Sequence, residues 1–140
     1  MPDGRNDVSA RVLSAINEVP ADQWDACAGL SNPFVRHAFL EALEESGSVA
    51  AATGWYPQHI VINGDDGQIA ACLPMYLKSH SYGEYIFDWG WADAYERAGG
   101  SYYPKLQAAV PFTPVTGPRM LVREDTTDDH YSTLISAMVQ

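Results

Sequence analysis

The segment from Gln58 to Leu77 constrains the fold of this chain more than any other. Gln58 to Asn63 is rich in β-branched residues, and Gly64-Asp65-Asp66-Gly67 follows with two glycines that can supply positive φ angles. From Gln68 onward, one face collects the apolar residues Ile69, Ala71, Leu73, Met75 and Leu77. The pattern predicts a β-hairpin whose second arm is an edge strand or carries a bulge at Pro74, because proline donates no ladder hydrogen bond.

Helices and further strands are predicted on both sides of this hairpin. Asn32-Pro33 opens a helix that runs to Gly47, because asparagine caps a helix and proline suits its first position. The remaining expected elements are a strand over 11–19, a helix over 21–28, a strand over 84–89, a helix over 92–98, strands over 105–110 and 120–122, and a helix over 127–140. This order predicts an α+β or mixed α/β fold.

Composition bounds the domain organisation and the partners. The 140 residues suit one domain, which we expect over 11–140 behind a flexible leader over 1–10. The formal net charge of −10 disfavours nucleic-acid or anionic-membrane binding. No run approaches the roughly 18 apolar residues of a membrane span, and the leader lacks the apolar stretch of a signal peptide, so a cytoplasmic protein is expected.

The predicted last helix is amphipathic and ends without a returning strand. A helix of this kind normally leads back into a sheet, so we expect a fragment of a longer chain; a complete terminal helix is the alternative.

Several kinds of chemistry have no motif in this sequence. Each of the four histidines stands alone, without a partner at metal-ligand spacing, so no metal site is expected. Cys27 and Cys72 lie in apolar surroundings typical of buried, reduced thiols. A Gly-x-Ser-x-Gly elbow and the glycine-rich phosphate loops are missing as well.

Aromatic residues concentrate in one part of the chain. Nine of the 16 aromatic residues fall between Tyr82 and Phe112, interleaved with charged residues. Apolar ring faces with a few orienting polar groups are typical of a ligand cleft. The alternative is that several of these rings belong to the core.

Glu84 and Asp88 are the candidate carboxylates of this region. On one strand they would lie roughly 13 Å apart, whereas glycoside hydrolysis needs about 5 to 9.5 Å, so we exclude that pairing. Either residue could act as a single general base, since burial beside apolar residues raises a carboxyl pKa; a salt-bridged or helix-capping Asp88 is the alternative. Lys78, Lys105 and Arg119 could bind an anionic ligand group or form structural ion pairs.

Five segments in the same order resemble the FemAB-like predicted N-acyltransferases of the GNAT superfamily. The resemblance covers about residues 20–140 and corresponds to the N-terminal portion of that family. It implies a GNAT-like fold, a mixed sheet with flanking helices, and relatives built from two such units. The segments are Asn32-Pro33-Phe34-Val35-Arg36-His37-Ala38-Phe39-Leu40, Leu73-Pro74-Met75-Tyr76-Leu77-Lys78, Gly83-Glu84-Tyr85-Ile86-Phe87-Asp88-Trp89, Tyr103-Pro104-Lys105-Leu106 and Val110-Pro111-Phe112-Thr113-Pro114-Val115-Thr116-Gly117-Pro118-Arg119.

The resemblance implies an N-acyltransferase, or the first domain of one, that moves an acyl or aminoacyl group to an amine. Acyl-CoA is the cofactor it implies, although the pyrophosphate-binding loop of ordinary GNAT enzymes is absent from this sequence. Glu84 or Asp88 would be the catalytic base, and a backbone N–H near Pro74 would stabilise the oxyanion. The expected substrate-binding residues are Tyr76, Lys78, His80, Trp89, Trp91, Tyr103, Lys105 and Arg119.

Two other functions stay open at this point. The aromatic band could belong to a non-catalytic module that binds a glycan or a peptidoglycan-like ligand by stacking. It could also be the face of a structural half that packs on a second domain or on another copy of the chain.

Overall fold

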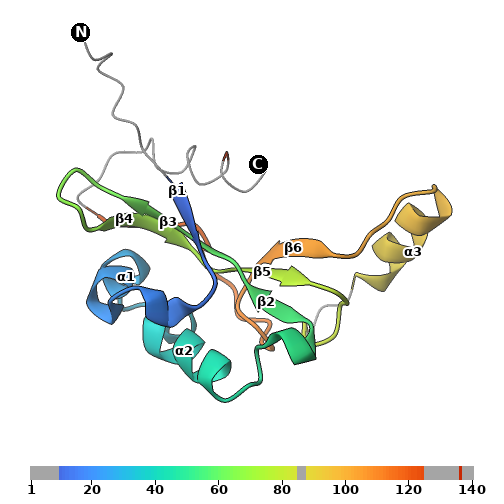
Figure 1. Cartoon of the computed structure of the whole chain (residues 1–140), viewed down its shortest axis with the longest axis horizontal. Coiled ribbons are helices and arrows are strands. Elements are labelled where there is room, and N and C mark those ends of the chain that lie inside the picture. Colours follow the sequence, from blue (N-terminus) through green and yellow to red (C-terminus); the bar gives the residue numbers. More distant parts are fainter. Residues whose placement is uncertain (1–9, 85–87, 125–135, 137–140) are drawn as a thin grey trace, which may run out of the picture.

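Two antiparallel sheets form the frame of the computed structural model, which describes residues 10–84, 88–124 and 136 (Figure 1). Every strand pair among these residues is antiparallel, so the architecture is α+β, one of the two predicted classes, and the mixed sheet implied by the family resemblance is not seen in this part of the chain. The four-stranded sheet has the order β1 (Ala10–Leu13), β3 (His59–Asn63), β4 (Ile69–Leu73) and β7 (Leu121–Val122). The three-stranded sheet has the order β2 (Trp55–Pro57), β5 (Met75–Lys78) and β6 (Lys105–Ala108).

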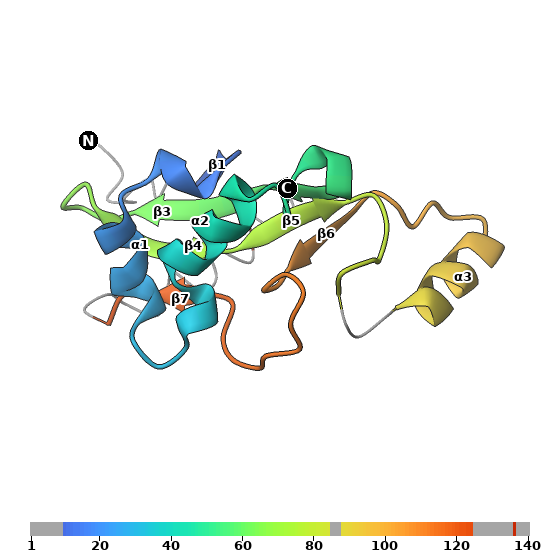
Figure 2. The same ribbon diagram turned by 90° about the horizontal axis from the view of Figure 1, so that it is seen from below.

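The helices divide between the body of the molecule and an outlying arm. α1 (Ala21–Ala28) and α2 (His37–Glu45) pack beside the four-stranded sheet, whereas α3 (Trp89–Arg97) lies away from the body, beyond the small sheet (Figure 2). Trp24 of α1 is fully buried, and its indole Nε1 donates to the Val35 carbonyl at 2.9 Å. The three short 3-10 turns are Ile16–Glu18, Pro33–Val35 and Ala51–Thr53.

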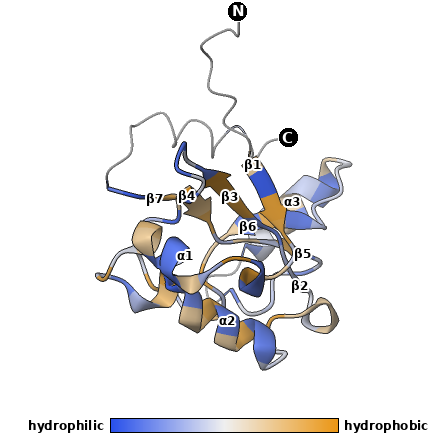
Figure 3. Cartoon of the chain, turned by 60° about the vertical axis from the view of Figure 1, so that its left-hand side comes forward, coloured by the Kyte–Doolittle hydropathy of each residue, from blue (hydrophilic) through white to orange (hydrophobic). Residues whose placement is uncertain are grey.

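The predicted hairpin is confirmed. β3 and β4 pair from Ile60 opposite Leu73 to Asn63 opposite Ile69. Both strands are almost entirely buried, which gives the strongly hydrophobic centre visible in Figure 3. The hairpin therefore supplies the middle of the four-stranded sheet.

The expectation that the second arm is an edge strand is wrong. β4 lies between β3 and β7, and β5 lies between β2 and β6. Pro74 separates β4 from β5 at the point where the chain passes from one sheet to the other, so no ladder needs the missing N–H there. The register irregularity falls instead between Ile62 and Asn63.

The other elements agree with the sequence in part. α1 has the predicted bounds, but the helix expected from Asn32 is split, because Arg36 is extended (φ −74°, ψ 151°) between a 3-10 turn and α2. Asn32 does cap this turn, accepting from the Phe34 N–H at 3.0 Å. The strand expected over 11–19 ends at Leu13, and β2 occupies residues for which the sequence analysis predicted no element.

Three expectations cannot be compared with the structure in full. The helix expected over 127–140 lies outside the described residues except for residue 136, which is helical. The leader over 1–10 lies outside them except for residue 10, the first residue of β1. The strand expected over 84–89 includes 85–87, which are not described, but its two ends are wrong: Glu84 is in no strand and Trp89 begins α3.

Candidate functional site

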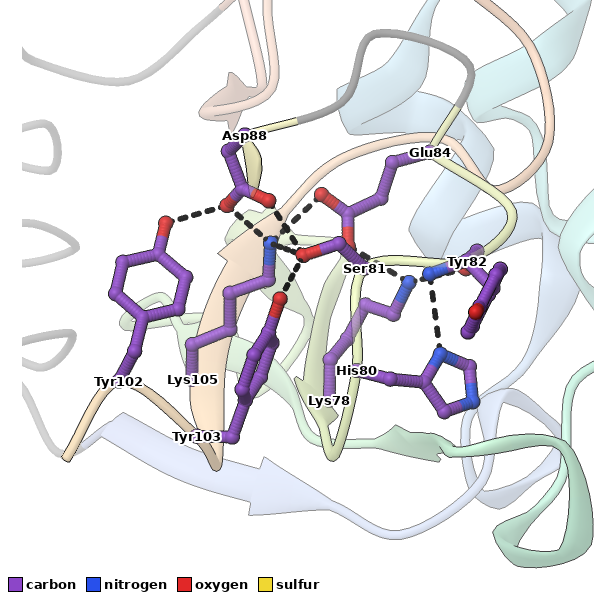
Figure 4. A network of polar contacts seen from close by, with 9 residues as sticks. All are labelled: Lys78, His80, Ser81, Tyr82, Glu84, Asp88, Tyr102, Tyr103 and Lys105. Carbon is purple, nitrogen blue, oxygen red and sulfur yellow. Dashed lines mark hydrogen bonds and ion pairs between the residues drawn. The ribbon is translucent and has the colours of Figure 1, made fainter. Parts of the chain in front are cut away.

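Two lysines face each other across adjacent strands of the small sheet. Lys78 ends β5 and Lys105 begins β6, and the antiparallel register pairs them directly. Trp55 of β2 is opposite Lys78 in turn, and its ring centroid lies 3.8 Å from Lys78 Nζ. Because like charges directly opposite each other destabilise a sheet, this face requires negative partners. Glu84 and Asp88, from the segment that follows β5, supply them (Figure 4).

Glu84 bridges the two ammonium groups. One carboxylate oxygen accepts from Lys78 Nζ at 2.8 Å and the other from Lys105 Nζ at 2.7 Å, and the side chain is only 4% exposed. Gln107, two residues along β6 from Lys105, also faces this carboxylate. With its amide nitrogen turned toward Glu84, it donates to the two oxygens at 2.9 and 3.2 Å. Glu84 is thus the charge that allows two lysines to share one face of a small sheet.

Asp88 is the second carboxylate of the cluster and lies immediately before α3. It accepts from Lys105 Nζ at 2.5 Å and from the hydroxyls of Ser81 and Tyr102. Burial raises the pKa of Asp88, but the hydrogen bonds from Lys105, Ser81 and Tyr102 outweigh it and bring this pKa to about 2. The expectation that burial tunes Asp88 into a base is therefore wrong; the salt-bridged alternative is the one observed.

The lysines do not activate a nucleophile. Burial lowers the pKa of Lys105, but its hydrogen bonds to Asp88 and Glu84 outweigh this effect, and the net result is a raised pKa. Lys105 Nζ donates to Ser81 Oγ at 3.1 Å, and an ammonium cannot take the serine proton. Burial lowers the pKa of Lys78, and the hydrogen bond to Glu84 opposes that shift. A serine–lysine mechanism at Ser81 is therefore unsupported.

Glu84 and Asp88 lie much closer together than one strand would allow. Each places an oxygen on the same Lys105 nitrogen, at 2.7 and 2.5 Å, so these oxygens are at most 5.2 Å apart (2.7 + 2.5). The roughly 13 Å separation expected of a strand is wrong, because the two residues do not share one. Glycoside hydrolysis is still unsupported, since one carboxyl of the pair must be a protonated general acid, whereas Glu84 and Asp88 are both ion-paired with lysines.

A groove of about 440 Å³ opens beside Glu84. Gln107 and Glu84 form one part of its wall, and the loop 113–117 together with Arg119 forms the other. Among the described residues, the lining of the groove therefore contains one acidic and one basic side chain, and its other members are neutral polar or apolar.

The guanidinium of Arg119 is held by its own loop. One terminal nitrogen donates to the Val115 carbonyl at 2.5 Å, and the other donates to the carbonyls of Gly117 and Pro118 at 3.2 and 3.5 Å. Burial lowers the pKa of Arg119. Among the residues that the structure describes, no carboxylate lies within ion-pair distance of it. Arg119 is thus a preorganised cation that faces a groove in which no described carboxylate forms an ion pair with it.

Not all the expected site residues come together. Lys78, Glu84, Asp88, Tyr103 and Lys105 form one polar cluster, in which the Tyr103 hydroxyl contacts Ser81 (Figure 4). Arg119 reaches the same region through the groove that it shares with Glu84.

Three of the expected aromatic residues do not take part in the polar cluster, although the Trp89 ring contacts Tyr82 at its margin, with the ring centroids 6.0 Å apart. Tyr76 is not a cleft wall: it is fully buried between Trp55 and His59, where burial and the nearby Glu44 raise its pKa. Trp89 and Trp91 are exposed on α3.

His80 lies at the margin of the cluster. Its Nδ1 accepts from the Tyr82 N–H at 3.1 Å, and its ring contacts the Tyr82 ring. Tyr82 in turn accepts from Lys78 Nζ through its carbonyl at 2.5 Å. His80 thus supports the turn after β5 and makes no hydrogen bond to Glu84 or Asp88.

The sequence did not identify three members of the cluster. Ser81, Tyr102 and Gln107 bind the carboxylates, but a serine, a tyrosine and a glutamine carry no motif. Gln107 alone had a usable signal, because it is two residues from Lys105 and therefore on the same face of a strand.

The backbone donor expected near Pro74 is already engaged. The Met75 N–H donates to His59 Nδ1 at 3.2 Å, and Met75 is buried. His59 Nε2 lies 3.0 Å from the Glu44 carboxylate, which fixes the ring. This N–H is therefore unavailable as an oxyanion donor.

The described residues contain no metal-binding cluster, and the groove beside Glu84 lacks the parts of a diphosphate site. No cluster of three or more His, Cys, Asp or Glu among them could hold a metal ion. The groove supplies one guanidinium and no glycine-rich turn before a helix, whereas diphosphates are bound by such turns or by several cations. The residues of this groove thus do not fit the diphosphate of an acyl-CoA. No helix in the described part of the chain has the length and apolarity to cross a membrane.

Comparison with known proteins shows the family of the chain. No curated protein and no solved structure matches the chain. The FemAB-like family, described as acting in peptidoglycan biosynthesis or recognition, matches residues 15–140, which is most of the sequence and includes the cluster and the groove. The chain belongs to the FemAB-like family.

Proposed function

We propose that this chain is an N-acyltransferase unit with a GNAT-like fold, which transfers an acyl or aminoacyl group to an amine of a peptidoglycan-derived peptide. The family assignment supports a peptidoglycan-related substrate. The observation that carries the proposal is the groove that the Glu84 carboxylate and the Arg119 guanidinium both line, and in which no described carboxylate pairs with Arg119. A peptide that bears an amine and a carboxylate offers an N–H donor to Glu84 and a counter-ion to Arg119.

In the proposed reaction the acceptor amine enters as a free base beside Glu84 and attacks the carbonyl carbon of the activated acyl donor. The C–N bond forms, the bond to the leaving group breaks, and the nitrogen loses one proton. The protonated nitrogen of the tetrahedral intermediate is a stronger acid than a free ammonium, so a carboxylate suffices to accept that proton. Glu84 is the carboxylate that lines the groove, and Arg119 holds an anionic part of the acceptor.

We assign Asp88 a positioning role in place of the base role expected from the sequence. With a pKa of about 2 it remains ionised and holds Lys105, which in turn holds Glu84. The acyl donor is not assigned to this groove, because the groove lacks a diphosphate site.

The proposal is tested by incubating the chain with a synthetic peptidoglycan stem peptide and with acyl-CoA or aminoacyl-tRNA donors. Mass spectrometry detects the acylated amine. We expect transfer by the natural sequence and a loss of at least about tenfold in Glu84→Gln. Asp88→Asn is expected to lose less, and circular dichroism establishes that each variant is folded.

Absence of transfer with every donor contradicts the proposed function. Equal transfer by folded Glu84→Gln and by the natural sequence removes Glu84 from the base role.

A second candidate function is a non-catalytic glycan-binding module, and α3 favours it. Trp89, Trp91 and Tyr95 are exposed on this helix, and tryptophan faces stack on sugar rings. Quenching of tryptophan fluorescence by N-acetylglucosamine oligomers, without transfer activity, would support this function. Loss of the quenching in Trp91→Ala would assign it to α3.

A further inference from the structure

The anion that matches Arg119 is defined by the charges of the groove. Arg119 is the one basic side chain among the described residues that line the groove, and Glu84 lies in the same groove with its charge already shared between Lys78 and Lys105. A single guanidinium balances a single carboxylate. A diphosphate would bring at least two negative charges toward Glu84, in a chain of net charge −10, with no second cation among the described lining residues to receive them.

The loop around Arg119 is built to hold the guanidinium in one place. The Val115 N–H donates to Thr113 Oγ1 at 3.3 Å, and Asn32 Nδ2 donates to the Thr116 carbonyl at 3.5 Å. At Gly117 (φ +137°), a Cβ would lie 3.0 Å from Asn32 Nδ2, so glycine allows the close approach of loop and turn. The Arg119 guanidinium is therefore already held in place before a ligand binds.

The bonds of Arg119 leave capacity for a ligand. A guanidinium has five N–H groups, and the described contacts of Arg119 are three, all to carbonyls of its own loop. Carbonyls do not neutralise its charge, and burial already lowers its pKa. A carboxylate would supply both the missing acceptors and the missing negative charge.

We infer that this groove binds the carboxylate of a peptide, with Arg119 as the residue that selects it against phosphate-bearing ligands. The inference rests on the proposed function and makes it more specific: the acceptor is recognised through its peptide carboxylate and not through a nucleotide or lipid diphosphate. Glu84 lines the same groove as Arg119, so a ligand that carries an amine as well as the carboxylate bound by Arg119 is favoured.

Binding is measured by nuclear magnetic resonance titration of the full chain, without any acyl donor. The probes are the dipeptide D-alanyl-D-alanine, its C-terminal amide, and inorganic pyrophosphate. We expect the dipeptide to bind, and the amide to bind at least about tenfold more weakly, since a charge-assisted hydrogen bond is lost. Pyrophosphate is expected to bind more weakly than the dipeptide. A glutamyl-alanine amide carries its carboxylate on a side chain. Binding as tight as that of the dipeptide would show that the groove takes a side-chain carboxylate, and weaker binding would show that it selects the C-terminal one.

Two variants accompany the probes. Arg119→Gln is expected to lose dipeptide binding by the same factor as amidation of the ligand. Arg97→Gln is the matched control, because Arg97 pairs with Asp93 on the exposed surface of α3 and its loss removes the same charge away from the groove. It is expected to bind as the natural sequence does.

The comparison between acid and amide uses the natural sequence and does not depend on how a variant folds. Equal binding of the two, tighter binding of pyrophosphate, or no binding of the dipeptide overturns the inference. Peptide binding without any acyl transfer overturns the proposed function alone.

Discussion

The two sheets of this molecule are stabilised by different interactions. In the four-stranded sheet, β3 and β4 are buried almost throughout by apolar side chains. In the three-stranded sheet, β5 and β6 place Lys78 directly opposite Lys105, and Lys78 is as completely buried as the apolar residues of β4. The first sheet is held by surface removed from water, and the second by two carboxylates that reach it from the segment after β5.

Because of this difference, the two sheets should respond differently to the loss of one side chain, and the proposed ligand-binding residues belong to the more sensitive sheet. An apolar contact can be weakened in steps, because lost area costs free energy in proportion. A buried ion network fails when one partner is removed, because an uncompensated charge is left behind. The groove lies against the ionic sheet, so the residues proposed to act on a ligand also carry the fold around it.

The largest effect is expected from breaking the ionic sheet. Glu84→Gln leaves the ammonium groups of Lys78 and Lys105 facing each other, and we expect a loss of about 3 to 5 kcal/mol in the free energy of unfolding. Chemical denaturation at neutral pH measures it. The double variant Glu84→Gln, Lys78→Met should recover part of the loss, because it removes one of the two buried charges. A double variant less stable than the single one would contradict the ionic account.

A similar but graded effect is expected in the apolar sheet. Leu73 is fully buried in β4, and Leu73→Ala should cost about 2 to 5 kcal/mol through lost burial and a cavity. The conservative Leu73→Met should cost less than about 1.5 kcal/mol. The same denaturation experiment measures both. If Leu73→Met were as damaging as Leu73→Ala, apolar volume would not be what stabilises β4.

A smaller effect is expected from pH. The folded-state pKa of Asp88 is about 2, below the ordinary 3.8, so its contribution is fully present above pH 3.8 and is lost as the pH falls through about 2. We expect the natural sequence to be about 1 to 2 kcal/mol more stable than Asp88→Asn from this source at pH 6. The difference should shrink toward zero near pH 2. A difference that stays constant between pH 6 and pH 2 would show that the pKa is not lowered.

The smallest effect on the free energy of unfolding is expected from a substitution in α3. Trp91 on α3 is 78% exposed, so Trp91→Ala should change the free energy of unfolding by less than about 0.5 kcal/mol. Tyr76→Ala, which empties a fully buried position of the small sheet, serves as the contrasting variant and should cost about 3 to 5 kcal/mol. A large loss in Trp91→Ala would show that α3 contributes to the core.

The same contrast separates what could be predicted from the sequence. The apolar sheet follows from local patterns: an apolar run over residues 69–73, glycines at the turn, and a short apolar run before it. Each of these signals lies within a few residues of the element it predicts. The hairpin and α1 were predicted correctly for this reason.

The ionic sheet depends on contacts that are distant in the sequence. Lys105 meets Glu84 and Asp88 across 21 and 17 residues, and no spacing rule joins them. Apolar residues continue at every second position from Ile69 to Leu77, so the sequence indicated one strand where the structure has two strands in different sheets. A strand over 84–89 would hold Glu84 and Asp88 far apart, whereas both carboxylates bind Lys105 in the structure. Tyr76 was misplaced because an aromatic residue near charges has the same local appearance in a cleft and in a core.

The most direct test of the account is a hydrogen–deuterium exchange measurement of the chain with and without a peptidoglycan stem peptide. The account predicts slower exchange in β6 and in the loop 113–119, which form the groove around Glu84 and Arg119, and unchanged exchange in α3. Protection confined to α3, with β6 and the loop unaffected, would contradict the proposed site and would assign ligand binding to the aromatic arm.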